Sequence, residues 1–383
     1  MNFKNIGIIG GGQLGKMMVL EGKKLGLHFN ILDPSHDCPA SSIADQHIIG
    51  NFYDQEKIQS LAEISDVITY EFEHIDADML VELEKQGHRI YPSPSTLKII
   101  QNKYEQKNFL QKYGLSVPKF QKVVSIEDID RATEEYGFPL ILKSCKGGYD
   151  GKGNYVIKTK GDIKKAYGNL GGSHRDLMIE AYIPFKMEIS VLIARGITGE
   201  MKIYPLAENI HENNILKTTI APARVRRETE EKAHKLALKT MEILKGIGIF
   251  CIEMFVDQED NLFINEIAPR THNSGHYTIE GCSTSQFYQH LRGILGLPLG
   301  DTSLVKEAVM INLLGEEGYV GKTKVTGVEK ALALSGVYVH IYGKTDTKPN
   351  RKMGHATIVD TNVASALKKA DYVRDILKII SED

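Results

Sequence analysis

Two glutamates that could share a cation stand on either side of one predicted hairpin. The segment GIFCIEMFVDQEDNLFINEIAPR, residues 248–270, has two apolar runs joined by a polar QEDN turn. If the turn is centred within QEDN, Glu253 faces Glu266, with Cβ atoms roughly 4.5–5.5 Å apart. Two carboxylates this close repel unless a cation lies between them, and Mg²⁺ prefers such hard oxygen ligands. The spacing therefore predicts a magnesium site, with Asn265 as a neutral oxygen beside it.

The apolar neighbours of the two glutamates decide between a pocket and a solvated surface. Alternation along the strands puts Cys251, Phe255, Leu262 and Ile264 on the same face as the glutamates, provided that no bulge shifts the register. An apolar face favours burial, so we expect a pocket. The alternative is that both glutamates point outward as ordinary solvated residues.

A loop rich in hydrogen-bond donors follows the hairpin directly. The sequence PRTHNSGHYT contains Arg270, His272, Asn273 and His276 within a few residues of the predicted metal. An arginine can hold an anion through two parallel hydrogen bonds. We expect this loop to lie where a second substrate meets a nucleotide.

A glycine-rich stretch, KSCKGGYDGKGNYVIK at 143–158, is a candidate phosphate-binding element because bare backbone N–H groups can approach an anion closely. It is not a P-loop, since the glycine-to-lysine spacing is wrong and no Ser or Thr follows the lysine. The runs at 139–142 and 154–158 both indicate strands. The stretch is therefore predicted to be the tip of a β-hairpin, a flap over a polyphosphate; the alternative is a flexible surface hairpin.

The N-terminal sequence GIIGGGQLG contains a second glycine motif. Gly10, Gly12 and Gly15 match G-x-G-x-x-G between a strand and a helix, and Asp33 lies near the distance expected for a ribose-binding carboxylate. Taken alone, the motif indicates an NAD-dependent oxidoreductase. The physical argument supports only a turn that presents N–H groups to an anion, which could equally belong to a sugar phosphate.

The elements that carry these motifs fall into three parts. A strand–helix–strand pattern to Asp33 and a further strand at 65–70 predict a doubly wound α/β domain that ends at a proline-rich linker near 91–95. One helix is expected from Ser95 to about Tyr113, carrying Lys103 and Lys107. The expected domains are 1–95, doubly wound and Rossmann-like; 96–298, with a glycine-rich lid around 119–183; and 299–383, small and β-rich.

Two further helix boundaries can be read from the sequence. The helix 228–245 lies in the middle part and is expected to end at Gly246. The last part contains the strand-like runs AVMINLL, GVYVHIYG and HATIVD, followed by a C-terminal helix. Together the parts predict a mixed α/β and α+β protein.

Composition excludes several classes of function. The chain of 383 residues is 42% hydrophobic and 25% charged, and its formal net charge of −2 gives no footprint for nucleic acid or an anionic membrane. No apolar run reaches membrane-spanning length, and the N-terminal run is too short for a signal peptide. The four cysteines, Cys38, Cys145, Cys251 and Cys282, have no paired spacing for zinc or redox chemistry. We expect a cytoplasmic protein.

The motifs together resemble those of the ATP-grasp superfamily, and within it the N5-carboxyaminoimidazole ribonucleotide synthetases. The resemblance covers residue 7 to about 355 and depends on GGGQLG, YEFEHI, GGYDGKG, NEIAPRTHNSGHYT and NRKMGH. NEIAPRTHNSGHYT is highly specific, whereas the glycine motifs alone are weak. One departure is Asn350, where the family pattern has Gly before Arg351; this puts only the loop conformation in question.

The resemblance implies an ATP-grasp fold and assigns roles to matching residues. Glu253 and Glu266 would bind Mg²⁺, and Arg270, His272 and Asn273 would hold bicarbonate and carboxyphosphate, with Tyr149 and Lys152 also counted as catalytic. The residues implied in ATP binding are Lys103, Lys143, Gly148, Tyr149, Asp150, Gly151, Lys152, Gly153, Glu180, Ala181, Tyr182, Ile183, Glu188, His211, Asn265 and Glu266. The residues implied around 5-aminoimidazole ribonucleotide are Glu73, Tyr149, Asp150, Lys152, Lys344 and Arg351.

The implied reaction is an ATP- and bicarbonate-dependent carboxylation of 5-aminoimidazole ribonucleotide in purine biosynthesis, by an enzyme that is expected to be a homodimer. One alternative is another ATP-grasp ligase, using formate or forming a peptide. A second is the NAD oxidoreductase, which leaves the glutamate pair and the flap unexplained. A third is a nucleotide-binding sensor without catalysis, which the presence of every acidic and phosphate-binding position disfavours.

Overall fold

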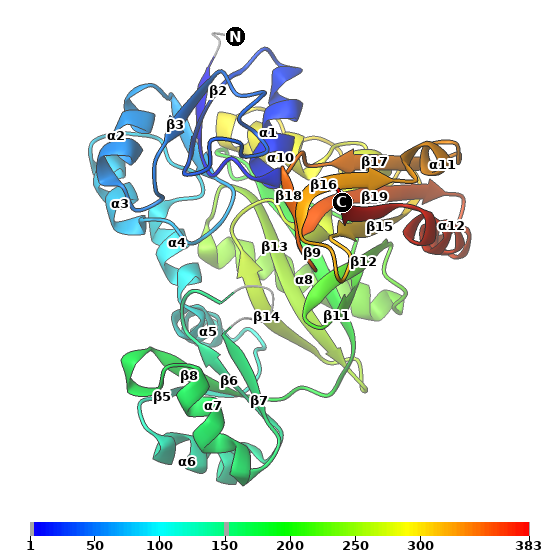
Figure 1. The fold of residues 1–383 in the computed structure, drawn as a ribbon. Coiled ribbons are helices and arrows are strands. Elements are labelled where there is room, and N and C mark those ends of the chain that lie inside the picture. The colour runs from blue at the N-terminus through cyan, green and yellow to red at the C-terminus, as the bar shows by residue number, and fades with distance from the viewer. Residues whose placement is uncertain (1–3, 149–152, 383) are drawn as a thin grey trace.

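The computed structural model describes residues 4–148 and 153–382. Tyr149, Asp150, Gly151 and Lys152, all predicted site residues, lie outside the described residues. In Figure 1 the N-terminal part and the C-terminal part flank a long central sheet, and a small domain extends away from them.

The N-terminal part is a parallel sheet of the doubly wound kind, as predicted. Its strand order is β3-β2-β1-β4, and all three strand pairs are parallel. The central strand β1 is buried at four of its five positions because it reads as an uninterrupted apolar run. The elements are β1 (Asn5–Ile9), α1 (Gln13–Lys23), β2 (His28–Asp33), β3 (Gln46–Ile49), α2 (Gln55–Glu63), β4 (Val67–Tyr70) and α3 (Ala77–Lys85).

The helix predicted from Ser95 to about Tyr113 is in fact two helices, α4 (Pro94–Gln101) and α5 (Lys103–Lys112). Asn102 between them has extended backbone angles, and its side chain accepts hydrogen bonds from the N–H groups of Tyr104 and Glu105. An asparagine in this geometry is a strong N-cap, which is why the chain restarts a helix here. Lys103 thereby becomes the first residue of α5.

The small domain contains the predicted glycine hairpin. Its antiparallel sheet has the order β5-β8-β6-β7, and β6 pairs with β7 from Leu140↔Ile157 to Lys143↔Asn154. The flanking strands of the predicted flap are therefore confirmed. The elements are β5 (Phe120–Val123), α6 (Ile126–Tyr136), β6 (Leu140–Ser144), β7 (Asn154–Ile157), η1 (Lys160–Asp162), α7 (Ile163–Asn169), η2 (Gly172–His174) and β8 (Leu177–Ala181).

The central sheet joins the middle and C-terminal parts of the chain. Its order is β14-β13-β9-β11-β12-β15-β19-β17, with β10 paired to β9. The sheet continues across the predicted boundary at 298/299, and the division into domains stays a prediction. The strands are β9 (Phe185–Arg195), β10 (Met201–Ile203), β11 (Ala207–Glu212), β12 (Ile215–Ala221), β13 (Gly248–Asp257), β14 (Leu262–Ala268), β15 (Glu307–Leu314), β17 (Val337–Ile341) and β19 (Lys352–Asp360).

The remaining elements cover the central sheet or extend it. A small sheet has the order β18-β16-β20, so the C-terminal part is β-rich, as predicted. The elements are α8 (Arg227–Leu244), η3 (Asn273–Gly275), α9 (Thr278–Gly281), α10 (Gln286–Leu295), β16 (Gly321–Thr326), α11 (Val328–Leu332), β18 (Asp346–Thr347), α12 (Val363–Ile376) and β20 (Lys378–Ser381). Helix α8 ends with Lys245 in the left-handed conformation, so the expectation that Gly246 ends it is wrong by one residue.

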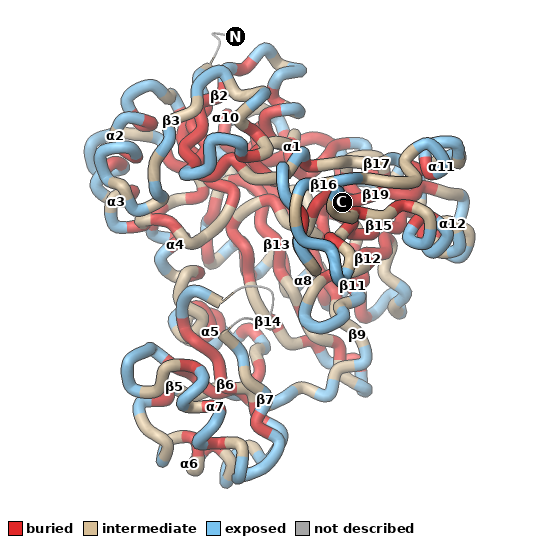
Figure 2. Tube along the Cα trace, viewed as in Figure 1, coloured by how far each residue is buried: buried red, intermediate tan, exposed pale blue. Residues whose placement is uncertain are grey.

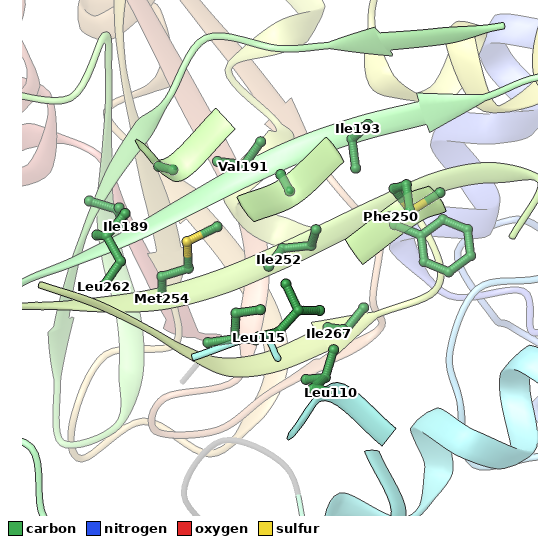
Figure 3. Packing of buried hydrophobic residues seen from close by; sticks show 14 of the residues in the cluster. Leu110, Leu115, Ile189, Val191, Ile193, Phe250, Ile252, Met254, Leu262 and Ile267 are labelled. Carbon is green, nitrogen blue, oxygen red and sulfur yellow. The ribbon is translucent and has the colours of Figure 1, made fainter. Parts of the chain in front are cut away.

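One face of β9 and β13 is covered by α8 and α5 and forms a hydrophobic core (Figure 3). Val191 and Ile252 lie in its middle, and Leu110 of α5 closes it. The trace is buried without interruption over 189–194 in β9 and 248–252 in β13, and Figure 2 shows these parts in red. The other face of these strands carries a second apolar cluster, with Leu192, Ile249 and Cys251, and further along the same strands Glu188, Glu253 and Phe255 line a cavity. Among the described residues, no helix is long and apolar enough to cross a membrane.

Candidate active site

A cavity of about 590 Å³ lies where the N-terminal part, the small domain and the central sheet meet. Its walls come from every part of the chain, for example Gln13, Lys143, Glu188 and Lys352. The predicted site residues that line it are Glu73, Lys103, Lys143, Gly148, Tyr182, Glu188, His211, Glu253, Asn265, Glu266, Arg270, His272 and Asn273. The sequence motifs, far apart along the chain, therefore meet in one place.

The predicted pairing of Glu253 with Glu266 is confirmed. The prediction assumed that no bulge shifts the register, but the register shifts directly after this pair, so that Met254 faces Ile264. The extra residue lets Asn265 and Glu266 both line the cavity, as two consecutive residues of a regular strand could not.

Because of the bulge, part of the predicted assignment of residues to the two faces of the hairpin is wrong. Leu262 and Ile264 were expected beside the glutamates but belong to the hydrophobic core on the opposite face. Phe255 lines the cavity, as expected, and Cys251 lies outside that core. The pocket is thus less apolar on the β14 side than the sequence indicated.

The electrostatics of the glutamate pair favour a bound cation. Burial and the neighbouring charge of Glu266 raise the pKa of Glu253 to about 7. Lys103 donates a hydrogen bond to Glu266, and although burial lowers the pKa of Lys103, the charge of Glu266 gives a net rise. Asn265 Oδ1 is buried and has no hydrogen-bond partner among the described residues. The cluster offers more oxygen ligands than the described protein groups satisfy.

Two lysines converge on Glu180 beneath the cavity. Lys143 Nζ lies 2.8 Å from Glu180 Oε2, and Lys107 Nζ lies 3.2 Å from Oε1. Lys107 also donates to the Asn265 carbonyl at 3.1 Å. Burial, and the charge of Lys143, lower the pKa of Lys107 to about 8, against the opposing effect of Glu180. The Glu180 side chain thus holds lysines and does not line the cavity, nor do Ala181, Ile183 and Gly153.

The wall formed by Tyr182, Glu188 and His211 suits a nucleoside. His211 Nδ1 lies 3.0 Å from Glu188 Oε2, and although burial lowers the pKa of His211, this hydrogen bond gives a net rise. Phe185 and Phe255 are stacked, with ring centroids 4.7 Å apart, and both line the cavity. Sequence reasoning missed Phe185 because nothing distinguishes it from a core phenylalanine.

At the opposite end, Arg270 is held by Glu73. The Arg270 guanidinium donates to both Glu73 oxygens, at 2.6 and 3.2 Å. Burial raises the pKa of Glu73, but the Arg270 charge outweighs it and the pKa is about 2. His272 Nε2 lies 3.9 Å from Glu253 Oε1, which links this end of the cavity to the glutamate pair. The Asn273 amide is buried, and neither its oxygen nor its nitrogen has a hydrogen-bond partner among the described residues.

His276 does not join the other donors of its loop. It is buried, and its ring is stacked on His355 with centroids 4.4 Å apart. The expectation that His276 donates beside the metal is therefore wrong.

Lys344 and Arg351, expected around the ribonucleotide, do not line the cavity. Lys344 Nζ donates to the Lys352 carbonyl at 2.7 Å, and Arg351 donates to the Asp346 carbonyl. Lys352 lines the cavity instead and was missed, although it follows Arg351 directly. Asn350 has φ +64°, a conformation that asparagine tolerates well, so the turn forms without the family's glycine.

The N-terminal glycine turn is already occupied. The N–H groups of Gly12 and Gly15 donate to Glu71 at 2.5 and 2.7 Å, and Gly11 N–H donates to Asp33 at 2.8 Å. The sequence predicted that this turn presents its N–H groups to the phosphate of a dinucleotide or of a sugar phosphate, whereas in the structure they donate to side chains of the protein. The N–H groups that a dinucleotide pyrophosphate requires are therefore not open to a ligand.

The fold and the site define an ATP-grasp enzyme. Residues 108–287 match the ATP-grasp domain, residues 3–101 the ribonucleotide synthetase preATP-grasp domain, and residues 308–369 the phosphoribosylaminoimidazole carboxylase C-terminal domain. The N5-carboxyaminoimidazole ribonucleotide synthase of Bacillus subtilis is 44% identical over 355 residues, which cover 92% of this chain and 91% of that protein.

Solved structures agree with this similarity. A Thermotoga maritima N5-carboxyaminoimidazole ribonucleotide synthetase is 46% identical, with a TM-score of 0.90 over 99% of this chain and 100% of that one. An Aspergillus clavatus synthase in complex with ADP and 5-aminoimidazole ribonucleotide is 35% identical, with a TM-score of 0.90 over 98% of each chain. This chain belongs to the N5-carboxyaminoimidazole ribonucleotide synthetase family.

Proposed function

We propose that this chain carboxylates 5-aminoimidazole ribonucleotide with ATP and bicarbonate, forming N5-carboxyaminoimidazole ribonucleotide through carboxyphosphate. One observation carries the proposal: a single cavity is lined both by the facing carboxylates of Glu253 and Glu266 and by Arg270 with its neighbours His272 and Asn273. His272, 3.9 Å from Glu253, connects the two. Such an arrangement brings a nucleotide phosphate and a small anion together, as phosphoryl transfer requires.

Glu253 and Glu266 would bind Mg²⁺, with Asn265 beside them. The residues fit the ion, because the carboxylates face each other and the Asn265 oxygen is buried without a partner among the described residues. When bound, Mg²⁺ neutralises phosphate charge and orients the triphosphate for in-line transfer. Lys103, now paired with Glu266, would turn to the phosphates together with Lys143.

ATP would occupy the side of the cavity between the small domain and the central sheet. Lys103 and Lys143 supply positive charge for the phosphates, and Glu188 can accept hydrogen bonds from ribose hydroxyls. The adenine would lie along Glu180–Ile183, where backbone groups can read its edge. Apolar side chains such as Ile141, Val156 and Leu216 line the same cavity and would contact the bound nucleotide.

Bicarbonate would be bound by Arg270, His272 and Asn273. Arg270 is fixed in place by Glu73, so its remaining donors are aimed before the substrate arrives. His272 has a pKa well below its usual value because of burial and the neighbouring Arg270 charge, so it is neutral. The unpartnered Asn273 amide supplies one donor and one acceptor.

The ribonucleotide would bind near Glu73. Lys344 and Arg351, which donate to backbone carbonyls and do not line the cavity in this structure, would have to turn toward its phosphate. Tyr149, Asp150 and Lys152 would reach it from the flap, in which Gly148, Gly151 and Gly153 permit close approach of the backbone. A closed flap would also exclude water from carboxyphosphate, which hydrolyses readily.

The proposed reaction has two steps, phosphoryl transfer to bicarbonate and then carboxyl transfer to the amine. A bicarbonate oxygen forms a bond to the γ-phosphorus of ATP as the bond to the bridging oxygen of ADP breaks. The exocyclic amine of the ribonucleotide then captures the carboxyl carbon, directly or as CO₂ released within the site. The carbon–oxygen bond to phosphate breaks, the amine loses a proton, and inorganic phosphate leaves.

Measuring ADP and product in one assay tests the proposal. With ATP, bicarbonate and the ribonucleotide we expect ADP and carboxylated ribonucleotide in equal amounts. A formylated ribonucleotide with formate, or an amide with an amino acid, would instead identify one of the other ATP-grasp ligases. ATP binding without any turnover would identify a sensor.

Assembly and location are part of the same proposal. We expect a homodimer, on the strength of the family resemblance, which light scattering of the purified chain would test. A cytoplasmic location is supported by the four cysteines, which are all buried and free. Fractionation of cells that produce the full chain would test it.

A further inference from the structure

The carboxylate of Glu71 occupies the place in the N-terminal glycine turn where a dinucleotide phosphate would normally bind. Its two oxygens accept the N–H groups of Gly12 and Gly15 at 2.5 and 2.7 Å. Glu71 follows strand β4 directly and is 9% exposed. The partial positive charge at the start of α1 is therefore matched from inside the protein.

The glycines of the motif are explained by this carboxylate. A Cβ atom on Gly12 would lie 2.3 Å from Glu71 Oε1, and one on Gly10 would lie 2.4 Å from Glu71 Cγ. Gly10 also has φ +103°, which other residues rarely adopt. The sequence G-x-G-x-x-G thus allows close approach of a side chain, and not of a cofactor.

The same carboxylate fixes residues that face the substrates. Gln13 and Leu14 lie between the two glycines that Glu71 binds, and both line the active-site cavity. Glu73, two residues after Glu71, also lines it and holds Arg270. One short segment after β4 therefore ties the first turn of α1 to the arginine of the site.

Two charged side chains, from Asp33 and Lys344, act on the Glu71 carboxylate. Asp33, from the end of β2, raises its pKa, and Lys344, from the segment after β17, lowers it; burial is the largest influence and raises it. Asp33 is itself occupied by the Gly11 and Ser35 N–H groups. Among the described groups, the backbone N–H donors of the turn are the closest partners of the Glu71 carboxylate.

We propose that Glu71 is a positioning residue for the ribonucleotide: it acts as an internal anion that holds the first turn of α1 in the shape that the second substrate requires. The inference rests on the proposed function, which places the ribonucleotide beside Glu73, in the cavity that Gln13 also lines. Glu71 itself lines the cavity, but its carboxylate touches no reacting atom in this scheme. Its effect should fall on ribonucleotide binding far more than on ATP.

Glu71→Ala tests this inference with a chemical rescue. We expect the KM for the ribonucleotide to rise by about tenfold, the scale of one lost positioning interaction, with the KM for ATP changed less than about twofold. Acetate can occupy the space that the Glu71 carboxylate leaves in the variant. It should therefore lower the raised KM again and leave the wild-type KM unaffected. Glu71→Gln keeps the shape but places an amide donor against N–H donors, so it should raise the KM without rescue by acetate.

Asp33→Asn is the matched control, since it alters a buried carboxylate in the same turn that does not line the cavity. We expect it to lower the melting temperature but to change the ribonucleotide KM less than about twofold. An unchanged KM in both Glu71 variants would overturn the inference. So would equal losses with both substrates that acetate does not reverse, because that pattern belongs to a purely structural residue.

A failure of the Glu71 inference can be distinguished from a failure of the proposed function. If the wild-type chain forms no carboxylated ribonucleotide, the proposed function fails before any variant is compared. If the wild type is active and acetate rescues nothing, only the role of Glu71 fails.

Discussion

At the residue scale, the site contains several carboxylates removed from bulk solvent, and they differ in whether a positively charged side chain is paired with them. Glu180 is paired with two lysines and Glu73 with Arg270. Glu253 has no charged ion-pair partner among the described residues, because His272, 3.9 Å away, is neutral, and the pKa of Glu253 is raised. Of these carboxylates, Glu253 is the one that lacks a charged partner, so we propose the cation at Glu253 and at Glu266 opposite it, and not at Glu180 or Glu73.

Glu266→Gln should remove most ATP cleavage, because one hard ligand of the ion loses its charge while the shape is kept. We expect a loss of about 10²-fold or more in ADP release, the scale of losing one electrostatic contact in a transition state. Glu259→Gln, in the exposed turn of the same hairpin, is the matched control and should behave as wild type. Wild-type turnover of the Glu266 variant at limiting magnesium would show that the metal assignment is wrong.

Glu180→Ala should destabilise the protein, because it leaves Lys107 and Lys143 buried without their shared partner. Breaking a buried pair in this way costs about 3–5 kcal/mol of unfolding free energy. Denaturant unfolding measures it, and Glu231→Ala is the control because its ion pair with Arg227 is exposed. Equal stability of the two variants would mean that the lysines are not held by Glu180.

At the scale of elements, the alternation of apolar residues and the polar turn residues predicted the strands and hairpins. They did not predict where the regular pattern is broken. The β13–β14 hairpin and the Glu253–Glu266 pair follow from counting outward from a polar turn. The bulge beside Asn265 could not be counted, because it depends on how β14 fits its neighbours. The break at Asn102 was in principle visible, since asparagine is a preferred N-cap, but the surrounding helical pattern concealed it.

A column of histidines joins elements from two parts of the chain and makes the fold sensitive to acid. His355 stacks between His276 and His340, and Glu280 accepts from His340 at 2.7 Å. Burial lowers the pKa of His276 to about 3, with further lowering by the charges of His340 and Lys352. The pKa of His355 is also lowered, by burial first.

These shifts fix the direction of the pH dependence. In the unfolded chain each histidine takes up a proton near pH 6.5, whereas folded His276 and His355 stay neutral. The unfolded state binds more protons below this pH, so we expect the melting temperature to fall steadily from about pH 6.5 toward pH 4. His276→Phe should flatten this dependence. A wild-type melting temperature that is constant over that range would contradict the assignment.

At the scale of the whole molecule, the sequence predicted the parts better than their junctions. The parallel N-terminal sheet and the glycine hairpin were predictable because each is specified locally. A pocket at the glutamate pair was predicted, but the contacts around it were not, because Lys107 meets Glu180 and Arg270 meets Glu73 only after distant elements pack together. The continuation of the central sheet into the C-terminal part, by β12 pairing with β15, likewise has no local signal.

The central claim, that ATP activates bicarbonate by phosphoryl transfer in this cavity, has one direct test. Bicarbonate labelled with ¹⁸O is supplied together with ATP and 5-aminoimidazole ribonucleotide, and the inorganic phosphate is analysed by mass spectrometry. The proposal predicts that each phosphate carries one oxygen derived from bicarbonate, because the bond formed in the first step joins that oxygen to phosphorus. Phosphate without label, formed in the same amount as carboxylated ribonucleotide, would contradict it.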